Sequence, residues 1–187
     1  MIVLASRSPR RAELLRSAGF EFRIQAADVD ETPRHGEAAV DYALRVAEEK
    51  NFAIGSAPNE IVLSADTVVV LGSEIMGKPA DADDARRMLN ALSGRRHEVI
   101  TGMCLRAGRR VLRDSASTAV WFGPLSADEI DFYVASGEPM DKAGAYGIQG
   151  IASRYIDRID GSYSNVVGLP VALVYERLRE FTQQFEA

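Results

Sequence analysis

The sequence predicts an α/β or mixed α+β protein in which helices cover a central sheet. Short apolar or β-branched runs alternate along the chain with longer segments whose apolar residues recur at helical spacing. The run at 61–72, IVLSADTVVVLG, is apolar enough for a central strand that is buried on both faces. No internal repeat, low-complexity segment or long linker interrupts the 187 residues. We therefore expect one domain over 1–187, or one domain with two lobes.

The chain begins with a predicted strand, tight turn and helix. The apolar residues 2–5 end at Ser6, and Pro9 suits the first turn of a helix. Either Ser6 or Ser8 could cap this helix, and Gly19 supplies its end. Such a junction presents free backbone N–H groups and the positive end of the helix dipole to an anion.

The later elements continue the alternation of strands and helices. Residues 22–31 predict a strand that runs into an acidic loop, and residues 36–54 predict an amphipathic helix with Lys50 near its end. Residues 81–94 predict a helix with acidic residues in its first turn and a glycine at its end. The remaining segments of the alternation are 97–108, 109–122 and the tail from Val166.

Composition argues against several classes of protein. A net charge of -5 and a pI near 5.2 argue against a broad nucleic-acid surface, which needs many cations to neutralise phosphates. No run of about 18 apolar residues predicts a transmembrane helix, and apolar residues followed by arginines reverse the order of a secretory signal. Cys104 is the only cysteine, so an internal disulfide and a cysteine cluster for zinc are both excluded. We expect a cytoplasmic protein without a membrane or nucleic-acid polymer as partner.

The first 25 residues reverse the sign of the chain's charge. They hold five arginines and two glutamates, so they carry +3 while the remainder carries -8. Three of these arginines, Arg7, Arg10 and Arg11, surround the Ser-Pro turn. This local reversal favours a site for a small anion. The alternative is a solvated helix face that happens to be rich in arginine.

Two acidic positions suggest chemistry. Asp66 interrupts an apolar run, where burial is costly unless the carboxylate is paired, hydrogen-bonded or bound to a metal. The alternative is that Asp66 stands at the end of the strand and caps a turn. The segment DVDE at 28–31 offers Glu31, which together with Asp66 could supply carboxylate oxygens to a magnesium ion. By itself, DVDE also fits a solvated loop.

Two loops carry further candidates. Lys78 stands in the loop GKP, 12 residues after Asp66, and could reach phosphate oxygens, although exposed lysines are common in loops. The glycine-rich segment 141–150, DKAGAYGIQG, contains Gln149, whose amide can both donate to and accept from a nucleobase edge. An ordinary irregular turn is the alternative. Walker and Rossmann motifs are absent. A G-x-S-x-G elbow is absent too, although the sequence alone does not exclude a Ser-His-Asp triad.

Several motifs, taken in order, resemble the Maf family from Val3 to about Leu178: LASRSPRR, VDE, AEEK, SADTVVV, GKP, LSGRRHEVITG, SGEPMDKAGAYGIQG and GSYSNVVGLP. This resemblance implies a mixed central β-sheet flanked by helices, with two lobes around a substrate cleft, as in Maf and ITPase-like proteins. It also implies a house-cleaning nucleoside triphosphate pyrophosphatase that yields a nucleoside monophosphate and pyrophosphate. A divalent metal, Mg²⁺ or Mn²⁺, is expected as cofactor, and a homodimer is possible.

Within the family, the sequence resembles the branch that acts on dTTP and UTP, including modified uridine nucleotides such as 5-methyl-UTP. The branch that acts on 7-methyl-GTP tends to carry a glutamate at the position of Gln149 and Asp-Pro-Thr near 163–165, where this chain has Tyr-Ser-Asn. Two alternatives follow from the family: a 7-methyl-GTP pyrophosphatase, and a nucleotide-binding regulator of septum formation in cell division.

The resemblance also assigns residues to roles. Asp66 matches the proposed proton acceptor, and base or metal ligand both remain open for it, with Glu31 helping to hold the metal. The SPRR turn would grip the leaving pyrophosphate through helix N–H groups and Arg10, with Arg11 in support, whereas Arg7 occupies a variable position. Positions linked to substrate specificity match Arg10, Thr67 and Gln149, and charged residues of the cleft match Glu31, Lys50 and Lys78.

Overall fold

The computed structural model describes residues 1–26 and 28–183, and it divides the chain into two compact units. Unit 1 comprises Met1–Thr67, Thr101–Ala116 and Gly168–Ala187, and unit 2 comprises Val68–Ile100 and Ser117–Val167. Two units are consistent with the predicted two lobes. The single domain over 1–187 and the substrate cleft stay predictions.

The strands of the described residues form one seven-stranded sheet in the order β2-β1-β3-β5-β6-β7, with β4 paired to β3. The β1 strand is parallel to both β2 and β3, whereas β4 is antiparallel to β3 and β7 to β6, so the sheet is mixed. This confirms the predicted α/β class. The strands are β1 (Ile2–Leu4), β2 (Phe22–Ile24), β3 (Ile61–Leu71), β4 (Glu74–Met76), β5 (Arg96–Ala107), β6 (Arg110–Phe122) and β7 (Ile156–Asp160).

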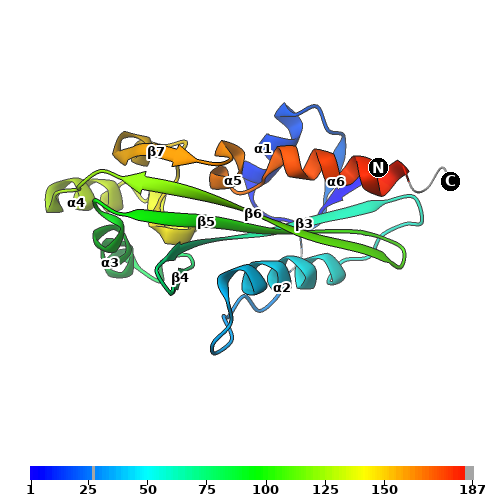
Figure 1. The fold of residues 1–187 in the computed structure, drawn as a ribbon, viewed down its shortest axis with the longest axis horizontal. Coiled ribbons are helices and arrows are strands. Elements are labelled where there is room, and N and C mark those ends of the chain that lie inside the picture. The colour runs from blue at the N-terminus through cyan, green and yellow to red at the C-terminus, as the bar shows by residue number, and fades with distance from the viewer. Residues whose placement is uncertain (27, 184–187) are drawn as a thin grey trace. The chain divides into compact units, whose positions relative to one another are not determined.

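In unit 1, helices cover both faces of the sheet. Helices α1 (Pro9–Ser17) and α6 (Val171–Gln183) lie on one side of the strands and α2 (Ala39–Phe52) lies on the other (Figure 1). The core under α1 and α6 includes Leu15 and Phe181, which pack with Leu63 and Ala65 of β3. Since strand side chains alternate between faces, the even-numbered residues of β3 are left to face α2.

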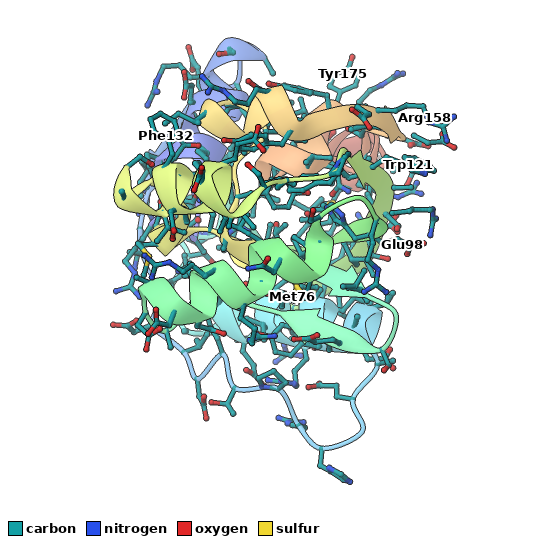
Figure 2. All side chains as sticks on the ribbon, turned by 90° about the vertical axis from the view of Figure 1, so that its left-hand side faces the viewer. Met76, Glu98, Trp121, Phe132, Arg158 and Tyr175 are labelled. Carbon is teal, nitrogen blue, oxygen red and sulfur yellow. The ribbon has the colours of Figure 1, made fainter. Side chains whose placement is uncertain are left out.

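In unit 2, helices α3 (Ala82–Leu92) and α4 (Ala127–Ala135) share a hydrophobic core with the strand segments that belong to this unit. At the sheet's edge, Trp121 of β6 pairs with Arg158 of β7, whose guanidinium lies 3.9 Å from the indole centroid (Figure 2). Short helical segments complete this unit: η1 (Glu138–Asp141), η2 (Ala143–Ala145), η3 (Ile151–Tyr155) and α5 (Tyr163–Val167).

The predicted strands and helices at the start and centre of the chain agree with the structure, but the short strands β4 and β7 were not predicted. Ser8 occupies the N-cap position of α1, but its side chain makes no capping hydrogen bond. The helix α4 was not predicted, although its start carries a capping box formed by Ser126 and Glu129. Asp66 lies inside β3, so the alternative that it ends the strand and caps a turn is wrong.

Among the described residues, no helix has both the length and the apolar character that a membrane span requires.

Candidate active site

Asp66 lies in the middle of β3 on the face that α2 covers. It is 5% exposed, and its Oδ1 accepts a hydrogen bond of 2.7 Å from Nζ of Lys50, in the last turn of α2. The same Nζ lies 2.8 Å from Oε1 of Glu31. Two carboxylates from separate segments therefore share one ammonium, which offsets the cost of burying Asp66. We call these three residues the carboxylate cluster.

The carboxylate cluster is buried on one side and open on the other. The Lys50 and Asp66 side chains are 10% and 8% exposed, whereas that of Glu31 is 40% exposed. Tyr42 of α2 donates a 2.6 Å hydrogen bond to the backbone carbonyl of Glu31, which ties the acidic loop to the helix. Burial, with Asp66 and Glu31 nearby, raises the pKa of Tyr42, so this phenol remains a donor at neutral pH.

Asn51, the neighbour of Lys50, anchors α2 to the sheet. It is fully buried, and its Nδ2 donates to the carbonyl of Val62, to Oγ of Ser64 and to the carbonyl of Cys104. Ser64 in turn donates a 2.6 Å hydrogen bond to the carbonyl of Ala47, one turn before Lys50. These bonds fix the rotation and height of α2 and so aim Lys50 at Asp66.

A glycine brings α2 close to the sheet at its other end. A Cβ atom on Gly102 of β5 would collide with the backbone of Ala43, so this position requires glycine for the observed packing. Asn51, Ser64 and Gly102 were not predicted from the sequence. One signal in the sequence could have identified Asn51: it is a polar residue on the apolar face of a helix, next to a lysine that was assigned to the site.

Arg11 lies on the opposite side of β3 from Asp66, next to Thr67. Its guanidinium is buried, and it donates to the carbonyl of Gly168 at 2.7 Å, to Oγ1 of Thr67 at 3.0 Å and to Oγ of Ser6 at 3.3 Å. Burial lowers its pKa, and the charges of Asp66 and Glu31 oppose that shift. Arg11 therefore joins α1, β3 and the segment before α6, and its support of a phosphate stays a prediction.

Thr67 and the two other arginines near the Ser-Pro turn, Arg10 and Arg7, lie in different surroundings. The Thr67 hydroxyl lies 2.9 Å from Oγ1 of Thr101 and 3.2 Å from the carbonyl of Gly168. Arg10 is half-buried at the start of α1. Arg7 is exposed and forms a 2.6 Å ion pair with Asp28, which is also exposed, so this pair adds little to stability. The alternative of a solvated arginine-rich face therefore fits Arg7 but not Arg11.

Lys78 and Gln149 belong to unit 2. Both side chains are exposed, and neither has a hydrogen-bond or ion-pair partner among residues 1–26 and 28–183. The structure thus brings together Glu31, Lys50 and Asp66 in unit 1, and it links Arg11 to Thr67 in the same unit. The approach of Lys78 and Gln149 to these groups stays a prediction.

The predicted metal ligands are Glu31 and Asp66. Within the described part of the chain, no group of three or more His, Cys, Asp or Glu side chains is arranged to hold a metal ion. The two carboxylates do converge, each within 2.8 Å of the Lys50 ammonium. Magnesium is commonly bound by one or two carboxylates, with water and substrate phosphates as its other ligands. The residues present therefore fit a metal whose coordination is completed by substrate.

Comparison with known proteins places the chain in a family. Residues 1–181 match the family described as Maf-like protein. The chain belongs to the Maf family. This Maf protein is 53% identical over 182 residues to a dTTP/UTP pyrophosphatase of Anaeromyxobacter dehalogenans (95% of this chain and 92% of the relative). It is 54% identical over 181 residues to a dTTP/UTP pyrophosphatase of Geobacter metallireducens (95% and 94%).

Among solved structures, the Maf protein is similar to a HAM1 protein from Coxiella burnetii. The match has a TM-score of 0.53 and 19% identity, and it covers 96% of this chain and 98% of that one. At this level of identity the likeness concerns the fold alone, and it agrees with the predicted mixed sheet flanked by helices.

Proposed function

We propose that this Maf protein is a nucleoside triphosphate pyrophosphatase that hydrolyses dTTP and UTP to the nucleoside monophosphate and pyrophosphate. The observation that carries the proposal is the carboxylate cluster, in which buried Asp66 and half-open Glu31 converge on Lys50. Relatives about half identical over nearly their whole length are named for this activity.

In this mechanism, Asp66 orients the attacking water or takes its proton. The water oxygen forms a bond to the α-phosphorus, and the bond from that phosphorus to the oxygen bridging to the β-phosphate breaks. Pyrophosphate then leaves with the bonding electron pair. A general base that is held in place typically accelerates such a step by about 10²–10⁴-fold. The ion pair with Lys50 holds Asp66 in one orientation, as this role requires.

Glu31 and Asp66 are the residues that would hold a divalent metal. When bound, Mg²⁺ or Mn²⁺ lowers the pKa of water and offsets charge on the phosphates. The backbone N–H groups at the start of α1, with Arg10, grip the leaving pyrophosphate. Lys50 and Lys78 add positive charge where negative charge develops on the leaving group, which stabilises the transition state more than the ground state.

Gln149 reads the base. Its amide can accept from N3–H and donate to O4 of uracil or thymine. This pairing makes no contact with C5, so it accommodates both bases and modified uridines such as 5-methyl-UTP. Cytoplasmic location and a possible homodimer accompany the proposal, and sedimentation of the purified protein tests the second.

The experiment that tests the proposal is pyrophosphate release from dTTP, UTP, 5-methyl-UTP, CTP, dGTP and 7-methyl-GTP, with Mg²⁺, with Mn²⁺ and with a chelator. We expect the thymine and uracil nucleotides to be preferred and the chelator to abolish release. A preference for 7-methyl-GTP would keep the chemistry and overturn the role of Gln149. Binding of triphosphates without release would favour the regulator of septum formation.

A further inference from the structure

The backbone on both sides of Gln149 is held by side chains from another part of unit 2. The N–H of Gly147 donates to the hydroxyl of Tyr133 at 3.2 Å, and the N–H of Ile151 donates to Oε2 of Glu138 at 3.0 Å. Gln149 itself is exposed between these two points. The loop is therefore fixed two residues before and two residues after the amide that is proposed to read the base.

The two holding side chains are joined to each other. The Tyr133 hydroxyl donates to Oε1 of Glu138 at 3.0 Å, so the carboxylate uses one oxygen for the tyrosine and the other for Ile151. Tyr133 is fully buried on α4, and burial raises its pKa, which keeps the phenol a donor. Hydrogen bonds to a carboxylate are stronger than those between neutral groups. We call Tyr133 and Glu138 the loop clamp.

The glycines of the loop fit the clamp sterically. A Cβ atom on Gly150 would collide with the carboxylate of Glu138, and one on Gly147 would lie 2.7 Å from Cε of Lys142. Lys142 in turn donates a 2.6 Å hydrogen bond to the carbonyl of Glu138. The loop thus passes directly over the clamp, and at Gly150, next to Gln149, a side chain would displace the Glu138 carboxylate from its place.

Fixed placement of Gln149 bears directly on specificity. Thymine and guanine both present a carbonyl and an adjacent N–H to an amide, at O4 and N3 in thymine and at O6 and N1 in guanine. The guanine pair lies farther from the sugar. An amide on a rigid backbone can discriminate by that distance, whereas an amide on a loose loop can follow either base.

We propose that Tyr133 and Glu138 are positioning residues for base selection, because their joined side chains hold the backbone at Gly147 and Ile151 and so fix the reach of Gln149. This inference rests on the proposed function, in which Gln149 reads the base. Both residues act through the loop and not by touching substrate.

The test measures kcat/KM for dTTP and dGTP, which share one sugar. In Tyr133→Phe, which keeps the buried ring, the dTTP:dGTP ratio falls about fivefold, as expected for one hydrogen bond. Glu138→Ala lowers the ratio further, and Glu138→Gln, which can still accept from Ile151, restores most of it. Tyr155→Phe is the matched control, because this buried hydroxyl contacts the carbonyl of Glu129 and not the loop. Its ratio should not change.

Amide hydrogen exchange gives a readout that does not need activity. Exchange at Gly147 and Ile151 is expected to quicken about fivefold in Tyr133→Phe relative to Tyr155→Phe. Unchanged exchange at both amides would overturn the clamp itself, whether or not the protein turns over any nucleotide.

Gln149→Ala separates the two possible failures. If Gln149→Ala leaves the dTTP:dGTP ratio unchanged, the base-reading part of the proposed function is wrong. If Gln149→Ala lowers the ratio while Tyr133→Phe and Glu138→Ala do not, the positioning inference is wrong. A further loss of ratio when Tyr133→Phe is added to Gln149→Ala would also overturn it, because the clamp would then act through another group.

Discussion

The two units bury titratable groups in opposite ways. In unit 1, buried Lys50 and Asp66 form an ion pair of 2.7 Å, so charge is balanced by charge. In unit 2, His97 is 2% exposed, and its Nε2 lies 2.8 Å from the Tyr146 hydroxyl between edge-on aromatic rings. Burial lowers the pKa of His97 to about 4, so this group is neutral at physiological pH.

The difference distinguishes buried charged groups that can bind a ligand from a buried neutral group that supports the fold. An ionic cluster with one half-exposed carboxylate can exchange its internal partner for a metal ion, a phosphate or a water. A neutral histidine bonded to a tyrosine inside an aromatic cluster offers no charge to a ligand, and it holds the glycine-rich segment 141–150 in place at Tyr146. The comparison predicts that removing the charge of Asp66 alters catalysis, whereas protonation of His97 alters stability.

The largest expected effect is on turnover at Asp66. Asp66→Asn keeps the shape of the side chain and removes its charge, so pyrophosphate release from dTTP should fall by about 10²–10⁴-fold. Asp114→Asn is the control, since Asp114 forms a half-buried ion pair with Arg177 and has no role in the mechanism. Circular dichroism checks that both variants fold. A loss of less than about tenfold would remove Asp66 from the centre of the reaction.

A second prediction concerns the free energy of unfolding. Lys50→Met leaves Asp66 buried without its ammonium, and breaking a buried pair in this way typically costs about 3–5 kcal/mol. Adding Asp66→Asn should recover a large part of this loss, because the uncompensated charge is gone. Urea denaturation of the two single variants and the double variant measures the coupling. Strictly additive losses would contradict an ionic interaction between the two side chains.

The control for this cycle is Arg113→Met. Arg113 forms a 2.9 Å ion pair with Glu48, also on α2, but its side chain is 55% exposed. Exposed pairs contribute about 0–1 kcal/mol. A loss at Arg113 as large as that at Lys50 would show that the effect is not specific to the buried pair.

The smallest effect is on the pH dependence of stability. Between pH 6.5 and about 4, the unfolded chain binds a proton at His97 that the folded chain does not, so folding is favoured less as the pH falls. The contribution of neutral His97 to the free energy of unfolding is fully present above pH 6.5. Near pH 4, about 3 kcal/mol of this contribution has been lost. Denaturation of the wild type and His97→Phe at several pH values measures this contribution to the free energy of unfolding.

His35→Phe, at an exposed position, serves as the control for composition. The His97→Phe curve should be flatter over this pH range than those of the wild type and the control. Parallel curves for all three proteins would show that His97 takes up its proton equally in the folded and unfolded chains.

Much of the fold was predictable because it rests on local patterns. The buried strand around Asp66, the amphipathic helix that carries Lys50 and the strand–turn–helix at the start all agree with the structure. Apolar periodicity specifies such elements from neighbours in sequence. The helix α4 was missed, although its capping box was available as a signal.

Residue types also indicated part of the candidate site. A carboxylate within an apolar strand requires compensation wherever it folds, so its neighbours in sequence were enough to make Asp66 a candidate. The same reasoning left open whether a strand end, a cation or a metal provides that compensation. The structure answers with Lys50, 16 residues earlier in the chain.

By itself, the sequence determined the strands β1 and β3, the helices α1, α2 and α3, the reversal of charge near the start and the need to compensate Asp66, because each follows from residue type and short-range spacing. Only the tertiary structure decided which groups meet: Asn51 under Lys50, Arg11 against Gly168, and Tyr133 with Glu138 under the loop of Gln149. The physical reason is that hydrogen bonds between distant segments depend on the rotation of each helix and the register of each strand. Those are fixed by packing of the whole core, which no local pattern encodes.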